Sequence, residues 1–600
     1  MKHSKTWFVV STLIIAAMVL AACQPAPAPA EQIIITEVVQ KEGEEVIVVV
    51  TPEAEKAPAG DEPVVLDICR GTSGDIPTID PALAWDVISI QIIDETTVGL
   101  TRQNEATAEN ELAMATDYSV SEDGRTYTFT LRDDVPWVKY DKVKDEVVQV
   151  MDCEGNPRMV TAQDFEYGIM RTADPATAAD YAFLISWFIE GAEAFTAGES
   201  EWDTVGVKAL DDTTLEITFL EPSVVNLSIA GLWFMHATPS WLIDGDECTE
   251  GVGDKWIETG FFQSYGPYVM EEWIHDATLT LAKNPLWPGN EVVPESQIDK
   301  IKWTTLSFSS CLAEFEAGNT DVVAIPAGDY DRISADPVYK EMMFPVATLG
   351  TEFYSFNTQL EPTDDARVRL ALSKAIDRET LVQILKSGIP AAWFTNPGAS
   401  GAPSPEKYPD LGVYYDPEGA KALLDEYLTE KGITAEELKL VMMFNTSEQH
   451  KMTAEVVQQM WRETLGVDVE LTNQEWKVYK VSRETGMENI YRSSWVQDYP
   501  DANNFIKEVF ATNGAYSNVV DWTTGEAFER FEALANQATG EADPEKRMEL
   551  YAQAEQILVA EEAVITPLYW YASYELRRPE FKMEVSKTGY ERFEKWQVVE

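Results

Sequence analysis

The chain has 600 residues, of which 45 are basic and 103 acidic, so its formal net charge is −58. At roughly 100–200 residues per domain, this length predicts two to four domains. Apolar residues make up 45% of the chain and charged residues 25%, and these ordinary globular values exclude wholesale disorder and a collagen-like structure. The excess of acid repels nucleic acids and anionic lipid surfaces, so we expect no nucleic-acid partner.

The first 22 residues have the pattern of a secretory signal peptide. Lys2 and Lys5 precede an uncharged apolar run over residues 7–22, which is short for a membrane-spanning helix of about 20 residues. The run leads into Leu20–Cys23, which resembles the bacterial lipobox, in which the cysteine is lipidated after cleavage. A plain signal peptide with a chance cysteine is the alternative. We therefore expect an exported protein in the cell envelope, at the outer face of the cytoplasmic membrane or in the periplasm, that touches the membrane only through lipid on Cys23.

Residues 23–63 are predicted to be a disordered tether. They are rich in proline and acid and contain no aromatic residue, so they cannot bury enough apolar surface to offset chain entropy. Two β-prone patches, Ile33–Ile35 and Val46–Val50, interrupt this segment. We predict no domain from them.

Four further cysteines lie in the body of the chain, at Cys69, Cys153, Cys248 and Cys311. An oxidising exterior permits disulfides, and four cysteines allow three pairings, among which the sequence does not choose. The chain has no CxxC or HExxH motif and only four histidines, so we expect no metal centre. It also lacks GxSxG, P-loop and dinucleotide-binding motifs, and we therefore expect no enzymatic activity and no cofactor.

The body of the chain mixes short alternating strands with amphipathic helices. Period-two alternation predicts strands at Thr126–Leu131 and Thr214–Phe219. Apolar spacing of three to four, with caps and breakers, predicts helices at Asp364–Leu385, Pro417–Leu428, Ala454–Leu465 and Tyr551–Leu558. Strands follow the last two of these helices, at Val467–Leu471 and Ala563–Tyr571. This alternation over residues 350–575 predicts an α/β lobe.

A series of ordered motifs over residues 66–580 resembles the extracytoplasmic solute-binding proteins of ABC importers, in the large oligopeptide and dipeptide class (family 5). The most specific motif is Arg367–Leu372 followed by Ala375–Arg378. The other motifs are Thr78–Pro81, Leu112–Ala113, Asp123–Arg132, Trp137, Val160–Phe165, Asp174–Ala178, Gly206–Asp212, Tyr265–Tyr268, Lys283–Pro285, Phe444–Ser447 with His450, Trp461, Leu465–Val467 and Asn473–Lys477.

The resemblance implies an α/β periplasmic-binding-protein fold with two lobes, a hinge between them and an extra domain in the first lobe. By motif position we expect lobe one at 64–98, 240–350 and 573–600, the extra domain at 99–239 and lobe two at 351–572. The sequence departs from the family between Trp137 and Val160, where a longer segment contains Cys153. We expect this insert, residues 138–159, to form a surface hairpin.

The resemblance also implies a set of ligand-binding residues. A buried amine needs a carboxylate and a buried carboxylate needs a guanidinium group. Asp498 matches the family aspartate that pairs with the α-amine of a peptide. Trp495 matches a pocket tryptophan, Arg492 and Arg483 match arginines that receive peptide carboxylates, and Tyr181 matches a tyrosine that contacts the peptide backbone. Tyr569 and Tyr571 lie where a family tyrosine contacts ligand from a late strand.

Each of these residues also has a structural interpretation. Asp498 fits a surface turn, because Tyr-Pro-Asp follows directly from it. Trp495 and Tyr181 fit ordinary packing, and Arg483 and Arg492 fit surface arginines. A disulfide seen in some family members is absent, because its aligned positions are Gly350 and Val496.

The resemblance implies a monomeric, lipid-anchored receptor that binds peptides and delivers them to the permease and ATPase subunits of an ABC importer. An alternative within the binding class is an oligosaccharide, for which the 18 tryptophans offer stacking surfaces. A nickel chelate or another small solute is a weaker alternative. An exported enzyme or a sensor partner is the alternative from a different class. Sugars carry no charged ends, so Asp498 and Arg492 favour a peptide.

Overall fold

The computed structural model describes residues 35–41, 44–50, 63–71, 74–223, 225–583, 585–586 and 589–599. The predicted signal peptide and Cys23 lie outside these residues. Residues 1–62 and 63–600 form two separate compact units. The described part of the first unit is one antiparallel hairpin of β1 (Ile35–Lys41) and β2 (Glu44–Val50). None of the described helices combines the length and apolar character needed to span a bilayer.

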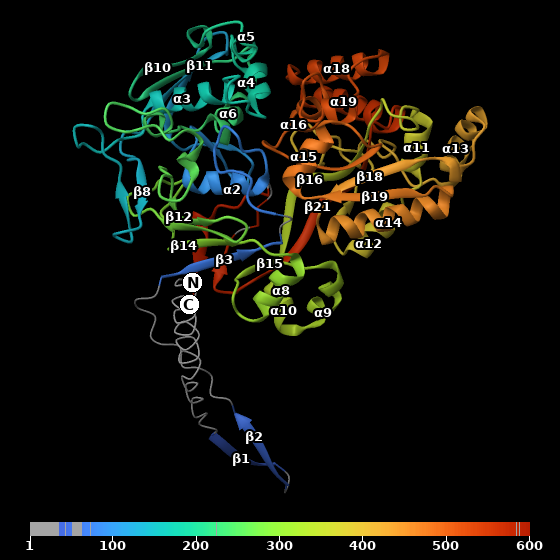
Figure 1. Ribbon diagram of the computed structural model, residues 1–600, viewed down its shortest axis with the longest axis horizontal. Coiled ribbons are helices and arrows are strands. Elements are labelled where there is room, and N and C mark those ends of the chain that lie inside the picture. The colour runs from blue at the N-terminus through green and yellow to red at the C-terminus, as the bar shows by residue number, and fades with distance from the viewer. Residues whose placement is uncertain are drawn as a thin grey trace, which may run out of the picture. The chain divides into compact units, whose positions relative to one another are not determined.

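The second unit is built on one large mixed sheet that runs through both of its lobes (Figure 1). On one side the sheet contains β3 (Val65–Cys69), β12 (Tyr268–Ile274), β13 (Thr278–Lys283), β14 (Lys300–Thr304) and β15 (Val322–Ala324). On the other side it contains β17 (Ile389–Pro390), β18 (Leu440–Asn445), β19 (Val469–Gln474) and β20 (Ile490–Val496). The two long strands β16 (Met343–Phe356) and β21 (Ile565–Arg577) lie between them.

β16 and β21 connect the two lobes. The C-terminal end of β21 pairs with β15 of lobe one, while the C-terminal half of β16 pairs with β20 of lobe two. Their mutual pairing shifts register between Ala347 and Thr351. Gly350 and Val496, the positions aligned with a family disulfide, are direct cross-strand partners on β16 and β20.

A separate four-stranded sheet carries the two strands predicted by alternation. Its order is β10-β11-β7-β6, and Thr126–Leu131 and Thr214–Thr218 are confirmed as β7 and β11. Their inward side chains join a core cluster that continues into the strands of lobe one. The other elements here are β4 (Thr101–Gln103), β5 (Asn110–Leu112), β6 (Ala115–Val120), α3 (Ala162–Ala173), α4 (Ala182–Phe188), α5 (Ala192–Thr196), β10 (Val207–Asp211) and α6 (Asn226–Ile229).

The insert over residues 138–159 forms the expected hairpin. Its strands are β8 (Val138–Asp141) and β9 (Glu146–Gln149). Cys153, just after the hairpin, forms a disulfide with Cys248, and Cys69 forms one with Cys311. The structure thus selects one of the three pairings that the sequence left open.

The remaining elements of lobe one surround its strands. They are α2 (Val87–Thr96), α7 (Ser240–Ile243), α8 (Phe308–Glu316), α9 (Tyr330–Ala335), α10 (Pro337–Met342), β22 (Phe581–Lys582) and β23 (Gln597–Val598).

The predicted helix over Asp364–Leu385 is wrong as one element, because the chain leaves the helix at residues 375–377. It forms α11 (Ala366–Lys374) and α12 (Arg378–Leu385), and the Asp377 carboxylate caps the second helix at the backbone NH of Thr380. The buried Arg378 guanidinium donates to the carbonyls of Ser373 and Ile376 and so stabilises the break. The apolar positions predicted to face inward are nevertheless buried.

The other predicted helices of lobe two agree with the sequence in type. The first begins at the predicted Pro417 and ends later, and the other two begin earlier than predicted. They are α13 (Pro417–Lys431), α14 (Glu448–Leu465) and α19 (Pro544–Glu555), the last followed by a π-helical turn over 556–561. Gly432 and Gly466 end the first two with φ of 68° and 70°, a left-handed conformation that favours glycine. Lobe two also contains α15 (Trp476–Glu484), α16 (Ala502–Phe510), α17 (Ser517–Val520) and α18 (Glu526–Thr539).

Candidate functional site

A cavity of about 460 Å³ lies between the two lobes. This volume falls within the range of about 300–1,000 Å³ that is usual for small-molecule sites. Lobe one contributes residues before and within α2, the segment around Tyr181, and Tyr590. Lobe two contributes α15, the end of β20 and the loop before α17. Four of the seven predicted ligand-binding residues line this cavity: Tyr181, Arg483, Trp495 and Asp498.

Contacts across the lobes close the rim of the cavity. The ring of Trp85 stacks on that of Trp476, with 5.0 Å between centroids. Lys480 forms an ion pair with Asp180, and its amine also lies 4.2 Å from the centroid of the Trp85 ring. Deeper in, the Tyr590 hydroxyl donates to the backbone oxygen of Gln497 at 2.9 Å. Residues from both lobes therefore meet at the rim of the cavity.

Asp498 lies two residues after the end of β20 and is 5% exposed, so the surface-turn interpretation is wrong. Its Oδ1 accepts the hydroxyl of Tyr181 at 3.1 Å and its Oδ2 accepts the side-chain amide of Asn504 at 2.9 Å. No lysine, arginine or histidine of the described chain forms an ion pair with it. Burial raises the pKa of Asp498 to about 7. Asp498 is therefore a buried carboxyl group with no cationic partner among the described residues.

Trp495 and Tyr181 form part of the cavity wall and are also packed against their own lobes. The indole NH of Trp495 donates to Asn504 at 2.9 Å, and its ring lies edge-on to Tyr516. Tyr181 packs edge-on against Trp233. Both side chains are almost fully buried and both line the cavity. The packing interpretation and the pocket interpretation are therefore compatible.

Arg483 is a buried cation without an anion. It lies on α15, is 4% exposed and donates from Nη1 to the Tyr516 hydroxyl at 2.6 Å. Its Nε has no acceptor, and none of the described carboxylates forms an ion pair with it. A buried guanidinium group of this kind is suited to receive a ligand carboxylate.

Arg492 lies on β20 but does not line the cavity. It forms a two-pronged ion pair with Glu352 on β16, with Nε 2.7 Å from Oε1 and Nη2 on Oε2. The Tyr571 hydroxyl donates to the same Oε2 at 2.7 Å. Tyr569 is buried, whereas Tyr571 lines a second cavity of about 440 Å³. The structure therefore separates these three predicted residues from the other four.

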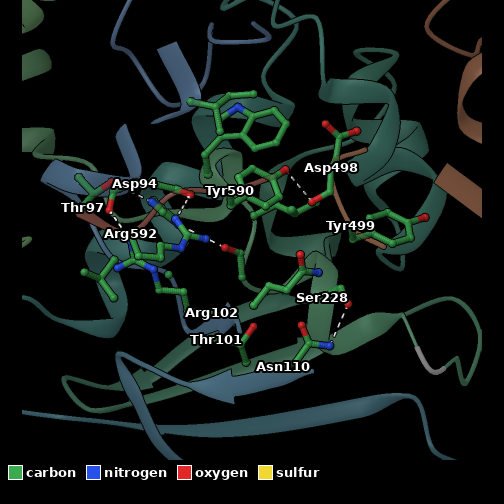
Figure 2. A pocket seen from close by; sticks show the side chains of 18 residues that line it. Asp94, Thr97, Thr101, Arg102, Asn110, Ser228, Asp498, Tyr499, Tyr590 and Arg592 are labelled. Carbon is green, nitrogen blue, oxygen red and sulfur yellow. Dashed lines mark hydrogen bonds and ion pairs between the residues drawn. The ribbon is translucent and has the colours of Figure 1, made fainter. Parts of the chain in front are cut away.

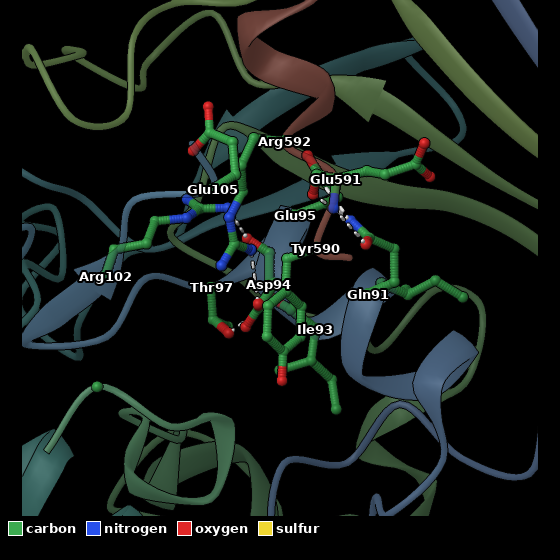
Figure 3. Close-up of polar contacts among 12 residues, drawn as sticks. Gln91, Ile93, Asp94, Glu95, Thr97, Arg102, Glu105, Tyr590, Glu591 and Arg592 are labelled. Carbon is green, nitrogen blue, oxygen red and sulfur yellow. Dashed lines mark hydrogen bonds and ion pairs between the residues drawn. The ribbon is translucent and has the colours of Figure 1, made fainter. Parts of the chain in front are cut away.

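A smaller cavity, of about 30 Å³, lies behind Asp498 on the side of lobe one (Figure 2). The Tyr590 hydroxyl at its edge donates to the backbone oxygen of Asp498 at 3.1 Å. Arg592 on the far side is already paired with Asp94 at 2.6 Å, within a network of buried polar contacts (Figure 3). Burial lowers the pKa of His236, which also lines the cavity, to about 4. On this side His236 is thus neutral near pH 7, and Arg592 is paired within the protein.

Residues in the cavity wall and behind it were missed by the sequence analysis. Trp476 belongs to the Asn473–Lys477 motif, but only the fold stacks it on Trp85 of the other lobe. Asn504 and Glu508 are buried polar residues spaced by four on α16. The sequence shows this spacing, and a predicted helix beginning shortly after Asp498 is the signal that identifies the two residues as neighbours on one helix face.

Two lobes joined by a pair of strands, with a cavity closed between them, define the class of solute-binding proteins that capture a ligand at a hinge. The family model of the bacterial extracellular solute-binding proteins, family 5, matches residues 109–517, and the chain belongs to this family. The resemblance and the two-lobed α/β fold predicted from the sequence are confirmed. The family consists of solute-binding transport proteins rather than enzymes.

Two relatives illustrate the match. The oligopeptide-binding protein OppA of Bacillus subtilis is 32% identical over 502 residues, which cover 82% of this chain and 85% of OppA. A structure of the Escherichia coli murein tripeptide binding protein MppA is 29% identical, covers 90% of this chain and 99% of its own, and has a TM-score of 0.76. The unliganded open form of MppA, with the same identity and coverage, has a TM-score of only 0.60. The lobes described here are therefore arranged differently from that open form.

Proposed function

We propose that this protein is the extracytoplasmic receptor of an ABC importer and binds short peptides in the 460 Å³ cavity. One observation carries the proposal: in the cavity wall, the buried acid Asp498 forms no ion pair with any described cation, and the buried Arg483 forms none with any described carboxylate. A zwitterion supplies the missing partner of each. The peptide amine would lie at Asp498 and its carboxylate at Arg483, with Trp495 and Tyr181 against the chain between them.

The proposal gives no direct ligand contact in the 460 Å³ cavity to the other three predicted residues, Arg492, Tyr569 and Tyr571. The pair between Arg492 and Glu352 already satisfies the charge of that arginine. These residues would reach ligand only if that pair opened, for example for a ligand that carries a second carboxylate near the second cavity.

We propose the domain boundaries expected from the sequence. Lobe one would comprise 64–98, 240–350 and 573–600, the extra domain 99–239 and lobe two 351–572. The sheet order supports them, because β3 and β12–β15 fall within the first set, β6, β7, β10 and β11 within the second and β18–β20 within the third.

The chemical test is calorimetry with trialanine, its N-acetylated form and its C-terminal amide. We expect each modification to weaken binding, because each removes one of the two charged ends. Mass spectrometry of ligand released from the purified protein identifies the natural solute. Binding of a cello- or xylo-oligosaccharide without binding of any of the peptides would replace the peptide proposal by the sugar alternative.

We further propose that the receptor is monomeric, is lipidated at Cys23 after removal of residues 1–22, and delivers its ligand to a permease driven by an ATPase. Leu20–Cys23 supports this proposal, and the several acyl chains of a bacterial lipoprotein would provide stable anchoring. Cys23→Ser should move the protein from the membrane fraction into soluble material. Unchanged fractionation with membranes would exclude the lipid anchor.

A further inference from the structure

A second buried acid lies directly behind Asp498. Glu508 is on α16, one helical turn after Asn504, and is 0% exposed. The side-chain amide nitrogen of Asn504 donates to Oδ2 of Asp498 at 2.9 Å and to Oε2 of Glu508 at 2.5 Å. One NH₂ group thus joins the two carboxyl groups.

The amide between the acids is held in one orientation. The oxygen of Asn504 accepts the backbone NH of Asp498 at 3.0 Å and the indole NH of Trp495 at 2.9 Å. The amide oxygen is therefore already bonded, and a flip that exchanged the oxygen and nitrogen positions would lose these bonds. Asp498 and Glu508 are consequently linked through a fixed donor.

No cation neutralises this pair of acids within the described structure. Asp498 faces the hydroxyl of Tyr181, the amide of Asn504 and, across the small cavity, Tyr590 and the already paired Arg592. Its neighbour Asp501 is satisfied separately by both Nη atoms of Arg547.

Glu508 faces the hydroxyl of Tyr499, which donates to its Oε1, and the amides of Asn503 and Asn504. Lys507 is next to it on the helix, but its amine lies over the ring of Trp187 and forms no ion pair with Glu508. Two ionised carboxylates in so dry a place repel each other and lose hydration, so at least one of them favours its protonated form. The pKa of Asp498 is raised to about 7 by burial, and that of Glu508 to about 8 by burial and by the charge of Asp498.

We propose that Asp498 and Glu508 act as one acid pair, which holds a proton while the closed cleft is empty and releases it to solvent when an ammonium group binds. The inference rests on the proposed function, in which the ligand amine lies at Asp498. The ammonium group keeps its three protons, the acid pair loses one, and that proton passes to the buffer. Glu508 is then a positioning residue, which acts on the ligand through Asn504 and Asp498.

The pair gives the amine site a pH dependence with a definite sign. Below about pH 7 the ligand must displace a proton from Asp498, so affinity should fall by up to about tenfold per pH unit. Near pH 8 the charge of the bound ammonium group should also favour loss of a proton from Glu508 to the buffer. Once Glu508 is ionised, its second negative charge should further favour a cationic ligand.

The experiment is calorimetry with trialanine from pH 6 to 9, in buffers of low and high ionisation enthalpy. For the wild type we expect nearly one proton released at pH 6 and continued release at pH 8. Glu508→Gln should keep the release at pH 6 but lose it at pH 8. The ratio of its Kd to that of the wild type should be near one at pH 6 and rise several-fold above pH 8, and titration of the peptide itself cancels in this ratio.

A matched control is Glu555→Gln. Glu555 is also a fully buried glutamate with a pKa raised to about 7, but it accepts the backbone NH groups of Phe394 and Thr395 and lines neither cleft cavity. This variant should keep the wild-type proton release. If Glu508→Gln fails to fold, Tyr499→Phe removes one donor to Glu508 and should shift the high-pH step upward.

The outcomes separate the two proposals. If trialanine binds only with its amine free but releases no proton at any pH, the acid pair is wrong and the amine site stands. If Glu508→Gln and the wild type behave alike at every pH, Glu508 has no part in the site. If acetylated trialanine binds as well as trialanine, or if no trialanine binds, the proposed amine site itself is wrong.

Discussion

Two arginines nine residues apart on the same lobe show how differently one side chain can be used. Arg492 on β20 is fixed to Glu352 by two charge-assisted hydrogen bonds. Arg483 on α15 is also buried, but its guanidinium group donates to the hydroxyl of Tyr516, lies over that ring and forms no ion pair with any described carboxylate. The first charge is satisfied by the fold, whereas the second has no anionic partner among the described residues. Under the proposed function, the difference teaches that the absence of a protein partner, more than residue type or burial, marks a charge that receives ligand.

The largest expected effect comes from breaking the satisfied pair. Glu352→Gln leaves the buried Arg492 without an anion, and removal of one partner of a buried ion pair typically costs about 3–5 kcal/mol of unfolding free energy. Glu426→Gln is the control, because its pair with Arg367 is solvent-exposed and should contribute about 0–1 kcal/mol. Denaturant titration measures both. Equal losses for the two variants would mean that the Arg492 pair has no special structural weight.

Asp498 belongs with Arg483 among the charges left for ligand, so its removal should affect binding and not folding. Asp498→Asn should weaken binding of an amine-bearing peptide by about 2–5 kcal/mol, or roughly 30- to several-thousand-fold. The pKa of Asp498 is raised in the fold from 3.8 to about 7. An acid of this kind opposes the closed fold progressively as pH rises above 3.8 and fully above 7. The empty variant should therefore be no less stable than the wild type at pH 8.

Calorimetry on both proteins with trialanine and its acetylated form closes a double-mutant cycle for this residue. A coupling energy near zero between the substitution and the acetyl group would remove Asp498 from the amine site.

Arg483→Gln should have a smaller effect, confined to binding. Loss of a hydrogen bond to a charged group costs about 1.5–3 kcal/mol, or roughly 10- to 150-fold in affinity. With a peptide whose C-terminus is amidated, the wild type and Arg483→Gln should bind with nearly equal affinity. The contrasting variant, Arg492→Gln, leaves Glu352 buried and unpaired and should lower stability instead. If Arg483→Gln lowers stability and leaves affinity unchanged, the comparison between the two arginines is reversed.

The sequence predicted much of this molecule but not the feature that distinguishes the two arginines. Alternation located β7 and β11, apolar spacing located the buried faces of the lobe-two helices, and resemblance identified Asp498 and Arg483. The pairing of Arg492 with Glu352 depends on the register of β16 against β20, whose residues are about 140 positions apart, and local pattern carries no information about such a register.

Two smaller features were also missed. The break between α11 and α12 depends on Arg378, whose guanidinium group also donates to the backbone oxygen of Pro567 at 2.7 Å and to the hydroxyl of Thr566 at 2.9 Å on β21. The link between Asp498 and Glu508 requires the start of α16 to be placed against the end of β20 by the cap at Asp501. The contacts of Arg378 with β21 arise from long-range packing, which completes the local signals. The link between Asp498 and Glu508 is local, and it was missed because α16 was not among the helices predicted from the sequence.

The smallest expected effect concerns the rim, where the two lobes meet around the charges left for ligand. The stack of Trp85 on Trp476 joins the lobes, so it stabilises the closed form and not the open one. Such a pair contributes about 0.5–1.5 kcal/mol, so Trp85→Ala should weaken peptide binding roughly two- to tenfold. Solution scattering should show a larger radius of gyration for the empty variant than for the empty wild type, and equal radii at saturating peptide, because ligand contributes its own contacts to closure. Trp202→Ala is the matched control, since its ring packs on Phe195 away from the cavity. If both substitutions weaken binding equally, the effect is a general loss of stability, and the rim stack has no part in closing the cleft.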